Sequence, residues 1–95
     1  MRKTQISYRA RHILLEDIED AEEVLVRLSE GDKFEDLARD VSECDSSEKG
    51  GDLGVFYTGD MVPEFERALY HMEVGEISKP VKTKYGYHII EKLKV

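Results

Sequence analysis

Residues 7–31 read SYRARHILLEDIEDAEEVLVRLSEG, and the hydrophobic period changes in the middle of this stretch. Its first nine residues, 7–15, alternate at period two, which is typical of a strand. In the remainder, 16–31, apolar residues recur at helical spacing, and carboxylates crowd the first turns, where they complement the positive end of a helix dipole. The stretch therefore predicts a strand followed by a helix, with Gly31 as the stop. One face of the strand carries Tyr8, Ala10, His12 and Leu14.

The rest of the chain continues this mixture of elements. A second helix is expected over residues 33–41, with Asp32 as its cap. Residues 42–54 are polar and glycine-rich, and we expect a loop without structure of its own, long enough to suggest a function. A third helix should begin at Pro63. The expected strands cover residues 55–57, 77–81 and 87–93, the last two joined by a loop over 82–86. This order indicates an α+β domain, with an antiparallel sheet packed by helices.

The composition limits the class of protein. The 95 residues allow one domain, which we expect over residues 1–95 with a flexible start at 1–6. Cys44 is the only cysteine, so a disulfide framework and a Cys-rich zinc site are excluded. The formal net charge of -7 argues against nonspecific nucleic-acid binding. No apolar run approaches the ~18 residues that span a bilayer, and no signal peptide is recognisable, so we expect a cytoplasmic protein without a membrane segment.

Three side chains are candidates for chemistry: His12, Cys44 and His88. The two histidines become neighbours if the first and last strands pair at the centre of the sheet, although the simpler explanation of each is a hydrogen-bonded core residue. Cys44 is also explained as a small buried apolar residue. A zinc site is disfavoured because the separations of 32 and 44 residues match no ligand spacing. A Cys/His hydrolase is disfavoured because no oxyanion-hole element is recognisable.

Four segments, taken together, resemble the parvulin family of peptidyl-prolyl cis/trans isomerases. They are RARHILL at 9–15, GGDLGVF at 50–56, GDMVPEFERAL at 59–69 and PVKTKYGYHII at 80–90. The resemblance covers nearly the whole chain beyond Ser7 and implies a four-stranded antiparallel sheet surrounded by helices, in the order β-α-α-α-β-α-β-β. One helix of that order has no counterpart in our reading of residues 42–54.

The resemblance also implies the residues of a site. A polar tetrad would consist of His12, Cys44, Thr83 and His88. An apolar pocket for a proline ring would consist of Leu53, Met61 and Phe65, with Phe56 as a further wall and Tyr85 at the rim. No metal and no cofactor are implied. The substrates implied are proline-containing polypeptides, and we expect a monomer.

One departure from the family bears on specificity. Phospho-specific parvulins have a Lys/Arg loop directly after the first strand, whereas residues 16–20 of this chain read EDIED. Carboxylates at this place would repel a phosphate. The chain is therefore more similar to the broad-specificity, single-domain prokaryotic type, which acts as a general folding helper. The alternative is a module of the same fold that binds proline-containing segments without turning them over.

Overall fold

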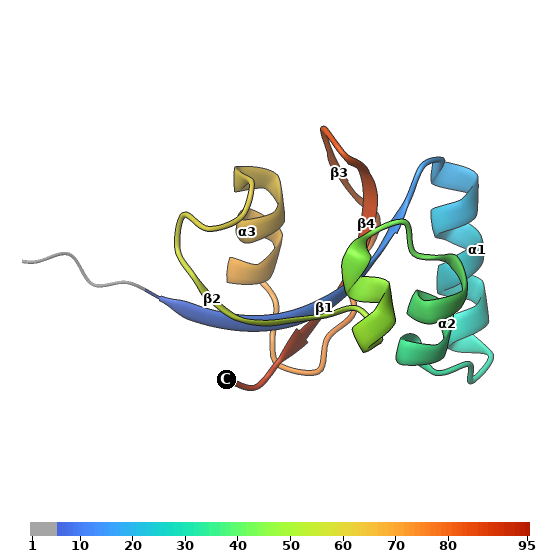
Figure 1. Ribbon diagram of the computed structural model, residues 1–95, viewed down its shortest axis with the longest axis horizontal. Coiled ribbons are helices and arrows are strands. Elements are labelled where there is room, and N and C mark those ends of the chain that lie inside the picture. The colour runs from blue at the N-terminus through green and yellow to red at the C-terminus, as the bar shows by residue number, and fades with distance from the viewer. Residues whose placement is uncertain (1–5) are drawn as a thin grey trace, which may run out of the picture.

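A computed structural model describes residues 6–95, which form a four-stranded antiparallel sheet with helices packed on both faces (Figure 1). The elements are β1 (Ser7–Leu15), α1 (Ile18–Ser29), α2 (Phe34–Val41), the 3-10 helix η1 (Asp45–Lys49), β2 (Asp52–Tyr57), α3 (Pro63–Tyr70), β3 (Val81–Thr83) and β4 (Gly86–Leu93). The strand order is β2-β1-β4-β3, so the first and last strands form the centre of the sheet. The predicted α+β class and its four-stranded antiparallel sheet are confirmed.

Alternation along β1 builds two separate cores, one on each face of the sheet. Ile13 and Leu15 point toward α1 and α2, where they pack with Ile89 of β4. Tyr8 and Ala10 point to the opposite face, where they pack with side chains of α3. Side chains of a strand alternate between the two faces, so a single strand can serve both layers. The central strands are thereby covered on both sides.

The helices α1 and α2 begin slightly later than the sequence predicts. The residue that precedes α2 is Lys33, and its side chain makes no capping hydrogen bond. The predicted cap, Asp32, instead accepts a hydrogen bond from Nε of Arg27 at 2.9 Å. The prediction of Asp32 as a cap is therefore wrong, because the carboxylate is used by a neighbouring guanidinium.

The predicted loop over residues 42–54 contains structure. Its middle forms η1, and its last residues already belong to β2, which begins at Asp52. The backbone attaches to β1 at two points: Glu43 N donates to the carbonyl of Leu14 at 2.9 Å, and His12 N donates to the carbonyl of Gly51 at 3.0 Å. The short helix implied by the family resemblance is thus present as η1, and the expectation of an unstructured loop is wrong.

The strand predicted over residues 77–81 is shorter and lies later, as β3. Ile77 makes only an isolated bridge to Glu91. The neighbouring Ser78 donates its N–H to the carbonyl of Ile90 at 2.8 Å, and its hydroxyl accepts the N–H of Ile90 at 3.0 Å. A side-chain oxygen therefore takes the place of a ladder carbonyl, and Pro80 offers no N–H, so regular pairing begins only at Val81.

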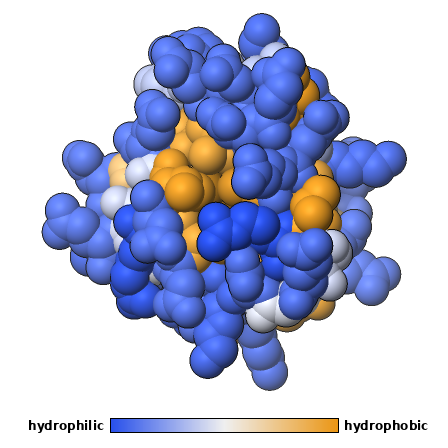
Figure 2. All heavy atoms as spheres, turned by 90° about the vertical axis from the view of Figure 1, so that its right-hand side faces the viewer, coloured by the Kyte–Doolittle hydropathy of each residue, from blue (hydrophilic) through white to orange (hydrophobic). Residues whose placement is uncertain are grey.

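The outer face formed by α1 and α2 is largely hydrophilic, with apolar side chains showing near its middle and toward the right-hand side of the view (Figure 2). Within residues 6–95, no helix has the length and apolar character needed to cross a membrane. Of the flexible start expected at residues 1–6, residues 1–5 lie outside the described part. Ile6 donates its N–H to the hydroxyl of Thr58 at 3.1 Å, and its carbonyl accepts the N–H of Thr58 at 3.0 Å.

Candidate active site

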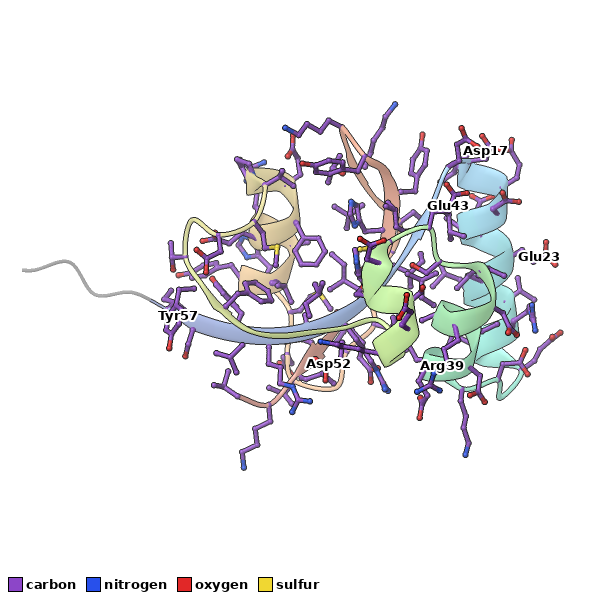
Figure 3. All side chains as sticks on the ribbon, viewed as in Figure 1. Asp17, Glu23, Arg39, Glu43, Asp52 and Tyr57 are labelled. Carbon is purple, nitrogen blue, oxygen red and sulfur yellow. The ribbon has the colours of Figure 1, made fainter. Side chains whose placement is uncertain are left out.

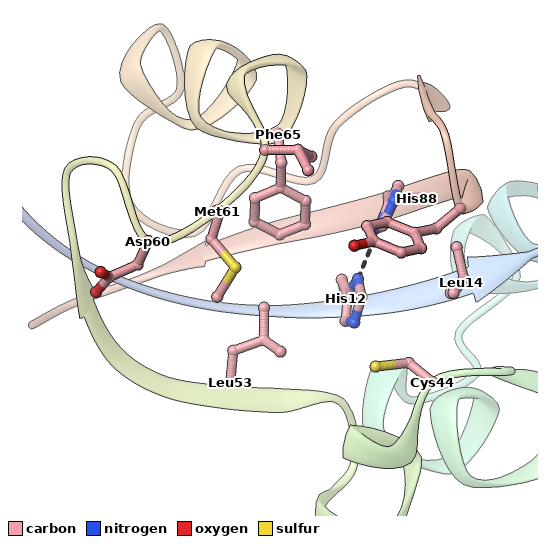
Figure 4. A pocket seen from close by; sticks show the side chains of 10 residues that line it. His12, Leu14, Cys44, Leu53, Asp60, Met61, Phe65 and His88 are labelled. Atoms are coloured by element: carbon pink, nitrogen blue, oxygen red, sulfur yellow. Dashed lines mark hydrogen bonds between the residues drawn. The ribbon is translucent and has the colours of Figure 1, made fainter.

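An apolar pocket of about 270 Å³ opens on the α3 side of the sheet (Figure 4). The residues that line it are His12, Leu14, Cys44, Leu53, Asp60, Met61, Val62, Phe65, Tyr85 and His88. They come from β1, β2, β4, α3 and three connecting segments, so the pocket exists only once the sheet has formed.

The apolar wall is built by β2, the β2–α3 connection and α3. Leu53, Met61 and Phe65, the three residues predicted to hold a proline ring, all line the pocket. Pro63 occupies the first turn of α3, where its missing N–H costs no helical hydrogen bond, and the helix then points Phe65 inward. Phe65 is only 2% exposed, so its ring is a fixed surface.

Phe56 does not line the pocket, although it was predicted as a further wall. Its buried ring lies 6.3 Å from that of Phe65 and 5.8 Å from that of Tyr8, measured between centroids. Phe56 therefore supports Phe65 from behind. Tyr85, predicted at the rim, lines the pocket and is exposed.

The two histidines meet where β1 pairs with β4. His12 and His88 occupy diagonal positions, since His12 is paired with Ile90 and His88 with Leu14. Their Nδ1 atoms lie 2.9 Å apart, and their rings are stacked with centroids 5.1 Å apart (Figure 4). Phe65 contacts both rings edge-on, at centroid distances of 5.6 and 5.3 Å. The pair therefore forms the floor under the aromatic wall.

Thr83 continues this hydrogen-bonded set below the floor. Its Oγ1 lies 2.7 Å from Nε2 of His88 and accepts the N–H of Tyr85 at 3.1 Å. The hydroxyl proton is thus free to donate to Nε2 of His88. Nδ1 of His88 then carries a proton and donates it to Nδ1 of His12, which leaves the proton of His12 on Nε2. The reverse assignment would leave the hydroxyl proton without an acceptor.

Both imidazoles are neutral at physiological pH. Burial, and to a smaller extent the neighbouring His88, lowers the pKa of His12 from 6.5 to about 4. Burial lowers the pKa of His88 to about 4 as well. A charged imidazolium loses its hydration when it is buried, so the neutral form is favoured. The floor of the pocket is therefore polar but carries no charge.

Cys44 directs its side chain toward His12 at the edge of the floor (Figure 4). It directly precedes η1, and its N–H donates to the hydroxyl of Ser42, which also accepts the N–H of Leu14. Ser42 therefore ties the segment before η1 to β1. Nε2 of His12 is buried and has no hydrogen-bond partner within residues 6–95.

The pocket is poor in charge. Among residues 6–95, Asp60 is the only acidic residue that lines it, and no Lys or Arg belongs to the lining. One carboxylate oxygen of Asp60 accepts the N–H of Tyr57 at 2.9 Å. Beyond the end of β1, Asp17 lies at the N-terminal end of α1 (Figure 3). Among residues 6–95 no group of three or more His, Cys, Asp or Glu side chains is placed to hold a metal ion.

The structure thus brings all four tetrad residues, His12, Cys44, Thr83 and His88, to one place. Leu14, Asp60 and Val62 are lining residues that the sequence analysis missed. Leu14 follows His12 at period two on the same face of β1, and this spacing is the signal that identifies it. Val62 precedes Pro63 and carries no comparable signal.

Known proteins similar to this chain share its fold and much of its sequence. The rotamase family model, described as the PPIC-type PPIASE domain, matches residues 12–94. The foldase protein PrsA of Halalkalibacterium halodurans is 56% identical over 90 residues, which cover 94% of this chain and 27% of that protein. PrsA of Bacillus subtilis is 53% identical over 85 residues, covering 88% of this chain and 29% of that protein. The chain thus spans less than a third of these curated relatives.

Solved structures agree with this relationship. The crystal structure of PrsA from Bacillus subtilis superposes with a TM-score of 0.90 at 50% identity, covering 94% of this chain and 35% of that one. The solution structure of NmPin, the parvulin of Nitrosopumilus maritimus, has a TM-score of 0.83 at 36% identity, covering 98% of this chain and 100% of that one.

Proposed function

Because the chain belongs to the PPIC-type peptidyl-prolyl isomerase family, we propose that its apolar pocket holds the proline ring of an unphosphorylated Xaa-Pro segment while the peptide bond rotates. No covalent intermediate is part of this proposal. The observation that carries it is the apolar wall of Leu53, Met61 and Phe65 above a neutral histidine floor. In this proposal His12, His88 and Thr83 form a hydrogen-bonded floor, and Cys44 tunes the polarity of the site.

The reaction suits such a pocket because no bond is made or broken. Rotation about the amide C–N bond must cross a resonance barrier of ~18–20 kcal/mol. Resonance is lost in the twisted state, so the carbonyl becomes less dipolar and needs hydration less than the planar form does. A pocket that holds the ring and keeps water from the carbonyl therefore binds the twisted state better than either planar isomer. Each tenfold gain in rate requires about 1.4 kcal/mol of this difference.

The proton arrangement supports the noncovalent course. A Cys44 nucleophile would need a base to accept its thiol proton. Cys44 points toward His12, whose Nδ1 is engaged with His88, so Nε2 would have to act as this base, but the hydrogen-bond assignment through Thr83 and His88 leaves a proton on Nε2. Among residues 6–95 no cationic side chain lines the pocket to stabilise a thiolate. Both features favour a role for Cys44 in shaping polarity.

The family and the charge of the chain support a class of client. Relatives are named foldase proteins. This name supports a domain of broad specificity whose clients are unfolded polypeptides. The carboxylates after β1, with Asp17 at the start of α1, support clients without a phosphate beside the proline. A cytoplasmic location and a monomeric state stay predictions.

The test is cis/trans exchange in a short unphosphorylated Xaa-Pro peptide, followed by NMR with the domain at about a hundredth of the peptide concentration. We expect faster exchange, and a loss of about tenfold or more in rate for Met61→Ala and for Phe65→Ala, because each removes a wall of the ring pocket. Val26→Ala, on the exposed side of α1, is the matched control and should keep the rate.

The alternative of a binding module has a distinct outcome. A module that binds without turnover would shift peptide signals in proportion to its occupancy and would leave the exchange rate at its uncatalysed value. That result for several Xaa residues, with the domain shown to be folded, would replace the isomerase proposal.

A further inference from the structure

A second groove adjoins the proline pocket on the other side of Met61. Its volume is about 580 Å³. It runs between the start of β1, the β2–α3 connection and α3, and its apolar surface comes from Ile6, Tyr8, Met61, Pro63 and Tyr70. Met61 lines both cavities, so a polypeptide that leaves the proline pocket on this side passes directly into the groove.

The groove exposes apolar surface that the fold itself does not use. Tyr70 is 62% exposed and Ile6 is 43% exposed, although both are large apolar side chains. The ring of Tyr70 lies edge-on to that of His71, with centroids 5.3 Å apart. Tyr8 forms a buried aromatic floor. Exposed apolar surface beside a binding pocket is a feature of sites that extend that pocket.

The chemistry of the groove favours an aromatic occupant. Two tyrosines offer ring faces, and Arg67 lies in the lining. Within residues 6–95, Arg67 forms none of the ion pairs, so its guanidinium is available to stack on an aromatic ring. The neighbouring Glu66 is occupied, because its carboxylate accepts the N–H of Gly59 at 2.9 Å.

We propose that this groove is a second subsite, which takes an aromatic side chain of the same polypeptide whose proline lies in the first pocket. Because both cavities share Met61, the aromatic residue lies within a few residues of the proline along an extended chain. This inference rests on the proposed function. The expected client is a segment with a proline and a nearby aromatic residue, whose side chains bind in the two adjoining cavities.

The experiment compares peptides of one length that contain a single Ala-Pro in an otherwise alanine-rich, soluble sequence. One Phe is placed in turn at each position from four residues before to four residues after the Ala-Pro. We expect kcat/KM for exchange to rise about 5- to 20-fold for Phe at one or two of these positions only, because only there does the ring reach the groove.

Substitutions in the groove test whether the rise in kcat/KM from Phe depends on it. Tyr70→Ala should abolish the gain from Phe and leave exchange of the peptide without Phe unchanged, and Arg67→Gln should reduce the gain. Tyr57→Ala is the matched control: it removes another exposed tyrosine, which follows Phe56 on β2 and so points to the face away from α3 (Figure 3). It should keep the full gain.

The outcomes separate this inference from the proposed function. Exchange that is accelerated equally for all peptides, or a Phe gain that survives in Tyr70→Ala, overturns the second subsite and leaves the isomerase. Absence of acceleration for every peptide overturns the proposed function instead. A concentration-dependent dimer that Tyr70→Ala abolishes would assign the groove to a second copy of the chain and would also overturn the subsite.

Discussion

At the scale of single residues, the site depends on two histidines that are kept neutral. His12 and His88 are 5% and 4% exposed, and each has an imidazole nitrogen committed to the other. A protonated imidazole would have to be buried without a counter-ion, which is strongly unfavourable. The pair therefore acts as a neutral hydrogen-bonded unit above pH 5, and this state has measurable consequences for stability.

Stability should rise with pH between about 4 and 6.5. The pKa of both histidines is about 4 in the folded chain and near 6.5 in the unfolded chain, so the unfolded state binds more protons in this window. The stabilisation is fully present above pH 6.5 and is lost as the pH falls toward 4, by as much as about 3 kcal/mol per histidine. Urea unfolding at several pH values measures it.

The control for this prediction is His71→Gln, because His71 is an exposed histidine next to α3. This variant should lose stability over the same window as the parent chain. The upper part of this window, from about pH 5.5 to 6.5, lies above the range where ordinary carboxyl groups titrate, so the change in stability there isolates the histidines. A free energy of unfolding that stays constant from pH 6.5 to 4.5 would contradict the burial of two neutral imidazoles.

Cys44 provides the second prediction at this scale. If Cys44 only sets the polarity beside His12, Cys44→Asp should keep the exchange rate within about tenfold of the parent, about 1.4 kcal/mol in activation free energy. NMR exchange at pH 7 with the same peptide measures it, with a melting curve to show that the variant folds. A loss of about a thousandfold in a folded variant would favour a nucleophilic thiol.

At the scale of elements, the segment that carries Cys44 is fixed by its contacts with β1. Gly51 accepts the N–H of His12, and its φ of +88° lies in the region that favours glycine. A Cβ at this position would collide with the carbonyl oxygen of His12. The sequence GG at 50–51 thus allows the backbone to approach the central strand directly beneath the floor of the site.

A matched pair of substitutions tests this contact. Gly51→Ala should lower the free energy of unfolding by about 2 kcal/mol more than Gly54→Ala does, because both strain a positive φ but only Gly51 faces a backbone collision. Gly54 has a φ of +71° and no atom within 4 Å of an added Cβ. Equal losses in urea unfolding would show that β1 is free to move away from the loop.

A second element, α3, is held at its C-terminal end by β4. Lys92 donates from Nζ to the carbonyl of Leu69 at 3.0 Å and to that of Met72 at 2.8 Å. A cation at this end complements the helix dipole, and it gives a second hydrogen bond to the carbonyl of Leu69, which also accepts the N–H of Met72. The same helix carries Phe65, so this contact also sets the distance between the aromatic wall and the sheet.

At the scale of the whole molecule, charge decides which clients approach the pocket. The chain has a formal net charge of -7, and α1 places acidic residues directly after the strand that carries His12. A phosphate beside the proline brings about two further negative charges into this field. Repulsion over distances shorter than the Debye length is only partly screened by salt.

We therefore expect phosphorylation of the residue before proline to lower kcat/KM by about tenfold or more at low ionic strength. Paired Ser-Pro and phospho-Ser-Pro peptides, compared by NMR exchange at 20 and 300 mM salt, measure the effect. Higher salt should narrow the difference, and a Glu-Pro peptide should fall between the two. Faster turnover of the phosphopeptide at either salt concentration would contradict the repulsion.

The sequence by itself determined the elements whose signal is local. The alternation in β1, the apolar stripes of three helices and the start of α3 at Pro63 all depend on neighbours within a few residues, so periodicity was enough to predict them. The likeness of four motifs to a known family added the short helix within residues 42–54 and the set of candidate residues. The prediction of Asp32 as a helix cap was wrong because its carboxylate pairs with Arg27, and the local pattern does not show this partner.

Only the tertiary structure decided what depends on contacts between distant segments. The histidine pair joins residues 76 positions apart, and its proximity comes from the pairing of β1 with β4. Packing and backbone partners on other strands likewise set three further features. These are the position of Phe56 behind Phe65, the structure within residues 42–54 and the late start of β3. Such interactions leave no periodic signal in the sequence, because they form only when strands that are distant in the sequence pair with one another.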